Sequence, residues 1–202
     1  MNQRKPDYLE KIEKRANDDG VPIIRTQAQS LLHLLLTIKG PKRILEVGTA
    51  VGFSTLLMRE YAPDGCTIVT IERDERMIVA AKENFLEFDK SKVISLLEGE
   101  ALEILKGLTG EFDFIFMDAA KGQYLGFLPE VIRLLADGGV LVSDNVLQEG
   151  EILESRFAVT RRNRTIHSRM REYLYELKHR NDLCTDILPV ADGVAVSCKI
   201  NI

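Results

Sequence analysis

Hydrophobic and polar positions follow two different periods along this chain. Short apolar runs typical of buried strands alternate with segments in which apolar residues recur every three to four positions, as in amphipathic helices. Strands are predicted over residues 44–47, 66–71, 93–97, 112–117, 140–143, 184–190 and 194–200. Helices are predicted over residues 7–15, 26–38, 54–61, 75–88, 100–107, 123–135 and 165–179. This alternation predicts an α/β fold, with a mainly parallel sheet and helices on both faces.

The last two predicted strands break this rhythm. They are joined by the short turn Ala191-Asp192-Gly193, which is typical of an antiparallel hairpin. Five parallel strands and this hairpin make a seven-stranded sheet. The chain has no internal repeat and no low-complexity linker, so we expect residues 1–202 to form a single domain.

Composition narrows the class of protein. The chain is 45% apolar and 29% charged, which is ordinary for a globular protein in water. No apolar run approaches the ~20 residues that cross a bilayer, and the first residues lack the apolar core of a signal peptide. The three cysteines have no metal-type spacing. We therefore expect reduced, buried thiols, a cytoplasmic location and no membrane partner.

Charge is concentrated in one segment. Residues 156–180 contain eight Lys or Arg against two Glu, although the whole chain carries a net charge of −4. A basic segment in an acidic protein indicates a local anionic partner. The alternative is a solvated helix face whose arginines pair with an acidic neighbour or with a dimer partner.

A glycine turn follows the first predicted strand. Gly48 and Gly52 come directly after it, and Ser54 opens the next helical pattern. Backbone N–H groups at such a helix start face an anionic or polar ligand. The spacing is G-x-x-x-G, and Glu46 precedes it, which fits an amino-acid zwitterion such as the methionine end of S-adenosylmethionine (SAM) better than a pyrophosphate. A tight turn without a ligand would have the same pattern.

Acidic residues end several of the predicted parallel strands, where ligands bind in open α/β sheets. Glu72 ends the second strand, 26 residues after Glu46, about where a carboxylate reaches the ribose hydroxyls of a nucleoside. The alternative for Glu72 alone is a solvated strand end.

A second acidic group follows the fourth and fifth strands. Asp118 and Asp144-Asn145 are expected to converge if these strands are neighbours. Two close carboxylates repel each other and need a cation or a proton between them. Their oxygens, with that of Asn145, suit Mg²⁺, or Mn²⁺ or Ca²⁺. The alternative is that these acids cap the helices that follow.

Lys121 lies three residues after Asp118. A divalent cation nearby would disfavour its charged form, so that Lys121 could accept a proton from a hydroxyl group. A surface lysine at a helix start is the alternative.

These motifs resemble the metal- and SAM-dependent O-methyltransferases of the catechol and caffeoyl-CoA type, over nearly the whole chain. The resemblance implies the class I SAM-dependent methyltransferase fold, which is Rossmann-like, with the N-terminal helices within residues 1–40 as a cap over the cofactor. It also implies the role of each site residue. Those expected to contact SAM are Ile24, Glu46, Gly48, Ser54, Glu72, Glu100, Ala101 and Asp118. Asp118, Asp144 and Asn145 would be the metal ligands, and Lys121 the general base, with Asp118 beside it in the catalytic group.

Glu100 departs from the family pattern, because relatives usually have a shorter Asp or Ser at that position. Within the family, the segment around residues 161–173 looks most like the bacterial methyltransferases that convert 5-hydroxyuridine at the tRNA wobble position to 5-methoxyuridine. A tRNA anticodon stem-loop would supply phosphates to arginines. The residues expected to contact it are Arg161, Arg162, Arg164, Arg169 and Arg171. The resemblance also implies a homodimer, and we expect no DNA partner.

Two other functions compete with a tRNA methyltransferase. One is methylation of small catechol-like metabolites, with the arginines in a dimer contact. The other is an RNA-binding or SAM-sensing module without turnover, against which the intact set of Asp118, Lys121, Asp144 and Asn145 argues.

Overall fold

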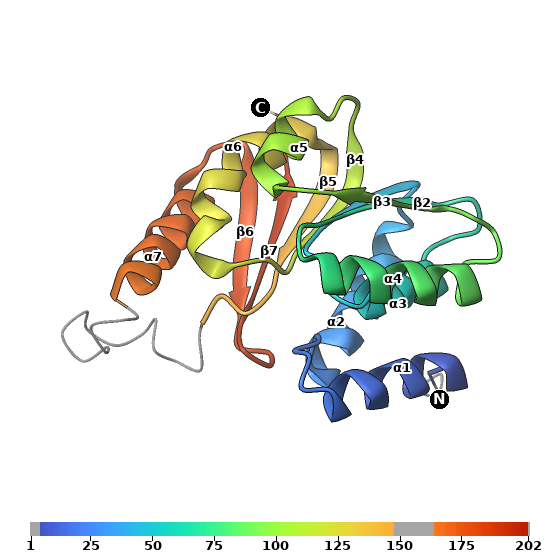
Figure 1. The fold of residues 1–202 in the computed structure, drawn as a ribbon. Coiled ribbons are helices and arrows are strands. Elements are labelled where there is room, and N and C mark those ends of the chain that lie inside the picture. The colour runs from blue at the N-terminus through green and yellow to red at the C-terminus, as the bar shows by residue number, and fades with distance from the viewer. Residues whose placement is uncertain (1–4, 148–163, 202) are drawn as a thin grey trace.

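A seven-stranded sheet organises the protein (Figure 1). The computed structural model describes residues 5–147 and 164–201. The strands, in chain order, are β1 (Arg43–Val47), β2 (Thr67–Glu72), β3 (Ile94–Glu98), β4 (Phe112–Met117), β5 (Leu135–Ser143), β6 (Leu183–Leu188) and β7 (Val194–Lys199). The helices are α1 (Asp7–Asp18), α2 (Thr26–Lys39), α3 (Phe53–Tyr61), α4 (Glu75–Phe88), α5 (Ala101–Gly107), the 3₁₀ turn η1 (Lys121–Gln123), α6 (Tyr124–Leu134) and α7 (Arg164–His179).

The strand order is β3-β2-β1-β4-β5-β7-β6. Strands β1 to β5 pair in parallel, and β7 is antiparallel to both β5 and β6. Strand β6 therefore runs in the same direction as the first five. The predicted fold class is confirmed, including the antiparallel C-terminal hairpin.

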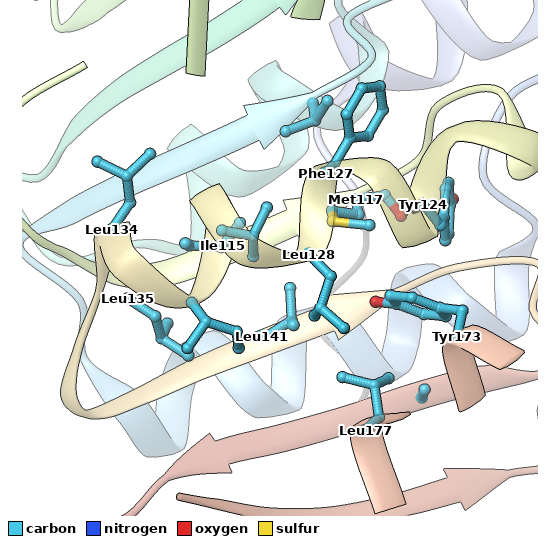
Figure 2. Packing of buried hydrophobic residues seen from close by; sticks show 14 of the residues in the cluster. Ile115, Met117, Tyr124, Phe127, Leu128, Leu134, Leu135, Leu141, Tyr173 and Leu177 are labelled. Carbon is cyan, nitrogen blue, oxygen red and sulfur yellow. Dashed lines mark hydrogen bonds between the residues drawn. The ribbon is translucent and has the colours of Figure 1, made fainter. Parts of the chain in front are cut away.

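Side chains alternate in direction along each strand and therefore contribute to two layers, one on each face of the sheet. On β1, Ile44 faces the layer that contains α1, α2 and α3, whereas Leu45 and Val47 face the layer that contains α5, α6 and α7. Both layers are mainly apolar, as is typical of a parallel sheet covered on two faces. Figure 2 shows the second layer, in which Leu128 of α6 and Tyr173 of α7 lie over β4 and β5.

The structure differs from the sequence prediction in three places. Strand β5 begins at Leu135, whereas the predicted strand begins at residue 140, and its pairing with β4 shifts register between Phe112 and Phe114. The helix predicted from residue 123 is preceded by η1. The three thiols are free but not all buried as predicted: Cys66 is buried, Cys198 is half-buried, and Cys184 on the edge strand β6 is exposed.

No helix among residues 5–147 and 164–201 combines the length and the apolar character that a bilayer crossing requires.

Candidate active site

The carboxyl ends of the parallel strands are joined by backbone hydrogen bonds. The N–H of Gly48 donates to the Ile71 carbonyl at 3.1 Å, and the N–H of Asp118 donates to the Val47 carbonyl at 3.0 Å. The N–H of Asp144 donates to the Met117 carbonyl at 3.0 Å. Each residue that follows a strand is thus fixed to the neighbouring strand. The site residues that follow β1, β4 and β5 therefore share one edge of the sheet.

A cavity of about 550 Å³ opens at this edge. It is lined by residues from the N-terminal segment, from the glycine turn and from the ends of β2, β3, β4 and β5. Of the residues singled out from the sequence, its walls include Ile24, Gly48, Ser54, Glu72, Glu100, Ala101, Asp118, Lys121 and Asn145. The cavity therefore joins the predicted cofactor residues to most of the predicted catalytic and metal residues. Glu46 and Asp144 are close to it but do not line it.

The glycine turn brings backbone from two strands together. Gly48 has φ +102°, and a Cβ atom there would lie 2.1 Å from the carbonyl oxygen of Asp118. A side chain cannot occupy that space, so only glycine permits this approach. Gly52, with φ +81°, starts α3. The turn leaves backbone groups facing the cavity, as a small polar ligand would require.

Glu72 has a fixed carboxylate. One oxygen accepts a hydrogen bond from the N–H of Ala50 at 2.8 Å, and the other accepts from Arg73 and Asp74 N–H groups at 2.8 and 2.9 Å. These bonds connect the end of β2 to the glycine turn. They also hold the carboxylate at the cavity wall, where its remaining lone pairs suit the two hydroxyls of a ribose.

Glu46 lies deeper than the sequence indicated. Its side chain is fully buried on the α3 side of β1, and its carboxylate accepts hydrogen bonds from the hydroxyls of Ser54, Thr55 and Thr70. Burial raises the pKa of Glu46 to about 7, against the opposing effect of these three hydrogen bonds. In the structure, Glu46 therefore holds the first turn of α3 against β1 and β2, and the predicted contact with SAM stays a prediction.

The two residues expected near an adenine differ from each other. Ala101 is half-buried at the start of α5, whereas Glu100 is exposed and forms an ion pair with Arg73 at 3.2 Å. Both line the cavity, with Ile24 on the N-terminal segment. Ile24 is 3% exposed, so it provides an apolar surface at the wall.

The acidic pair at the ends of β4 and β5 is brought together as predicted. Burial raises the pKa of Asp144 to about 7, and the charge of Asp118 adds to this effect. Burial also raises the pKa of Asp118, while the hydrogen bond from Asn145 opposes it. Asp144 is buried and Asp118 is half-buried at the cavity wall. Two neighbouring carboxylates that repel each other are the arrangement that a divalent cation stabilises.

The third candidate ligand is Asn145, whose amide nitrogen donates to Asp118 at 3.2 Å. As a metal ligand it would offer its oxygen instead. Its backbone has φ 59°, a left-handed conformation that asparagine tolerates better than most residues. No group of three His, Cys, Asp or Glu side chains in the described parts of the chain could hold a metal ion. A cation here would therefore need this amide with the two carboxylates.

Tyr124 fixes the positions of both strand ends. Its buried hydroxyl lies 3.0 Å from the carbonyl oxygen of Met117 and 3.2 Å from that of Asp144. Figure 2 shows its ring close to that of Tyr173, with the ring centroids 5.4 Å apart. The role of Tyr124 in tying β4 to β5 was not predicted.

Lys121 begins η1 and lines the cavity. Its positive charge lowers the pKa of both Asp118 and Asp144, although less than burial raises them. The ammonium group of Lys121 is thus close to the acidic pair.

The arginines expected to contact tRNA are only partly described. Arg161 and Arg162 lie outside the described residues. Arg169 and Arg171 are exposed on α7 and Arg164 is half-buried. Arg169 donates a hydrogen bond to the carbonyl of Gly122 at 3.1 Å, which places this part of α7 directly beside η1.

Sequence reasoning missed one acidic residue at the cavity. Asp192, in the turn between β6 and β7, is 8% exposed and lines the cavity. Its carboxylate faces Arg25 at 3.4 Å. Aspartate is common in hairpin turns. Its presence in this turn therefore did not indicate that it lines the cavity.

Comparison with known proteins agrees with this geometry. The sequence profile of the O-methyltransferase family matches residues 2–200. A catechol O-methyltransferase from Niastella koreensis is 32% identical over 67% of this chain, and the match spans 64% of that relative's length. Caffeoyl-CoA O-methyltransferase 1 from Eucalyptus globulus is 27% identical over 98% of this chain and 84% of its own.

Among solved structures, a methyltransferase from Podospora anserina with S-adenosylhomocysteine (SAH) bound has a TM-score of 0.88 and 28% identity. The similarity covers 99% of this chain and 91% of that one. The fold is accordingly the Rossmann-like methyltransferase fold. With a family match over almost its entire length, this chain belongs to the O-methyltransferase family.

Proposed function

We propose that this protein is a SAM-dependent, divalent-metal-dependent O-methyltransferase that acts on a hydroxyl group with an oxygen on the adjacent carbon. The observation that supports this most is the continuous cavity that connects Gly48 and Glu72 to Asp118, Lys121 and Asn145. A donor bound at the first pair would have its reactive end close to an acceptor held at the second group.

The cofactor residues divide by the part of SAM that they suit. The Gly48 turn, braced by Glu46 and Ser54, suits the methionine end, and Glu72 suits the ribose. Ala101 and Ile24 supply apolar walls, and Glu100 lies at the exposed rim beside Arg73. Bound SAM supplies an electrophilic methyl group, and a bound cation favours the deprotonated form of the acceptor hydroxyl.

Residues of this chain would then align the reaction. Asp118, Asp144 and Asn145 would hold the cation, and Tyr124 keeps the strand ends that carry them together. Lys121 would accept the proton of the acceptor hydroxyl. The acceptor oxygen forms a bond to the methyl carbon while the bond from that carbon to sulfur breaks, which leaves SAH. Alignment of the two reactants would be the main contribution of the protein.

For the acceptor, we propose 5-hydroxyuridine at the wobble position of tRNA, in which O4 and the 5-hydroxyl are vicinal oxygens. The support is the position of α7. Arg169 contacts the carbonyl of Gly122, one residue from Lys121, and Arg171 is exposed further along the same helix. Cationic side chains beside an active-site turn suit the phosphates of a stem-loop.

A small catechol-like metabolite is the second candidate acceptor. It is favoured by the relatives, which include a catechol O-methyltransferase and a caffeoyl-CoA O-methyltransferase. A catechol has the same pair of vicinal oxygens but needs no cationic surface. In that case the arginines of α7 would belong to a contact with a second copy of the chain.

A comparison of methyl transfer to the two candidate acceptors tests this proposal. The protein is incubated with labelled SAM, Mg²⁺ and either tRNA that contains 5-hydroxyuridine or catechol. We expect label in the tRNA, and Arg169→Ala and Arg171→Ala should reduce this transfer and weaken its dependence on salt. Label in catechol alone would exclude tRNA, and label in neither would contradict the proposed activity.

A further inference from the structure

Two residues from opposite ends of the chain meet at the rim of the cavity. Arg25 lies in the segment between α1 and α2, and Asp192 lies in the turn between β6 and β7. The guanidinium Nη2 of Arg25 is 3.4 Å from Oδ2 of Asp192, and both residues line the cavity. The Arg25 side chain is 51% exposed, whereas that of Asp192 is 9% exposed.

Each partner is attached to a different side of the site. The segment before α2 is held from within by Gln29, whose buried amide donates to the Ile24 carbonyl at 2.8 Å. The same segment contributes Ile24 to the cofactor wall. Arg25 is therefore the next residue after a predicted cofactor contact, and its guanidinium group meets the hairpin turn at Asp192.

Asp192 is attached to the acceptor side. Its backbone carbonyl accepts a hydrogen bond from the N–H of Leu147 at 2.9 Å, and Gly193 accepts one from Val146 at 2.9 Å. These bonds fix the hairpin turn to the residues that directly follow Asn145. The Asp192 carboxylate is also close enough to Asp144 for their charges to interact. The turn is therefore attached to the segment that directly follows the candidate metal ligand Asn145.

We propose that Arg25 and Asp192 are positioning residues whose ion pair holds the N-terminal wall of the SAM site against the acceptor side of the cavity. Neither group is placed to react. The pair joins two walls that no common strand or helix connects. Its energy is modest, because Arg25 is half in solvent. The ion pair would keep the wall that carries Ile24 and the wall that carries Asn145 at a fixed separation, so that both contact the same bound molecules.

The inference rests on the SAM site of the proposed function but not on the tRNA acceptor. The test measures the dissociation constant of SAH by calorimetry for the unaltered protein and for Arg25→Gln, Asp192→Asn and the double variant. We expect each single change to weaken SAH binding about twofold to fivefold. The double variant should bind SAH no more weakly than the weaker-binding of the two single variants. Arg25→Lys keeps the charge and should restore most of the affinity.

A kinetic measurement separates positioning from a general loss of structure. In methyl transfer to whichever of the two proposed acceptors takes up label, the variants should raise KM for SAM by about the same factor as the Kd of SAH, while kcat changes less. The control is Arg180→Gln, which breaks a 2.6 Å Arg–Asp pair with Asp182 that does not line the cavity. This control should leave SAH binding unchanged.

Three results would overturn the inference. Unchanged SAH affinity in both single variants would show that the ion pair does not position the wall of the SAM site. Additive losses in the double variant would show that the residues act separately. Failure of the unaltered protein to bind SAH would remove the SAM site, and the proposed function with it. Because Arg25 is largely on the surface, its variants should fold even if Asp192→Asn does not.

Discussion

The carbonyl oxygen of Asp118 lies 2.1 Å from the position that a Cβ atom of residue 48 would occupy. The glycine turn after β1 and the end of β4 are therefore in direct backbone contact. This contact joins the predicted cofactor turn to the first predicted metal ligand, which makes Gly48 the residue on which both parts of the site depend.

Gly48→Ala should damage the site through this contact. The added methyl group must displace Asp118 while the backbone keeps φ +102°, so we expect a loss of stability of about 2 kcal/mol or more. SAH affinity should fall at least tenfold, which calorimetry measures. Gly65→Ala is the control, because Gly65 has φ +82° but nothing within 4 Å of its added Cβ. Equal losses in the two variants would assign the effect to backbone strain alone.

Tyr124→Phe should loosen the two strand ends without removing a site residue. The lost hydroxyl contacts the carbonyls of Met117 and Asp144, and we expect a stability loss of about 1 kcal/mol. Methyl transfer should fall further than under Tyr173→Phe, which removes a 2.6 Å hydrogen bond between Tyr173 and the hydroxyl of Ser143. Equal activity in the two variants would show that Tyr124 supports only the core.

The buried carboxylate of Glu46 predicts a pH dependence of stability. Its pKa is raised from 4.5 to about 7 in the folded state, so the folded protein binds more protons than the unfolded chain between these values. The free energy of unfolding should therefore fall as pH rises from about 4.5 to 7. Urea denaturation at several pH values should show a weaker decline in Glu46→Gln. An identical slope in that variant would show that another group controls the effect.

The sequence predicted the architecture because the periodicity of its apolar residues distinguishes buried strands from amphipathic helices. Alternating short apolar runs and amphipathic segments can bury their apolar faces only as a covered parallel sheet. Acidic residues that follow parallel strands must then lie at the same edge of the sheet. The sequence therefore predicts that Glu72, Asp118 and Asp144 lie at this edge. The bounds of β5 were not predictable in this way, since its register shift depends on the pairing with β4.

Two features of the site were harder to predict. Glu46 alternates with Leu45 and Val47 along β1, so its side chain faces α3 and not the layer that holds Leu45 and Val47. The alternation in the sequence already contains this signal. Asp192 could not be found in the sequence, because it reaches the cavity only through the pairing of β7 with β5. Its partner Arg25 lies more than a hundred residues away in the chain.

The account depends most directly on a cation held between Asp118 and Asp144. Labelled methyl transfer from SAM to an acceptor with vicinal oxygens should be measured with Mg²⁺, with EDTA, and in Asp144→Asn, with SAH affinity measured in parallel. We predict transfer that requires Mg²⁺ and is lost in Asp144→Asn, while SAH binding stays within about twofold of its original value. Full transfer in EDTA, or in Asp144→Asn, would contradict the account.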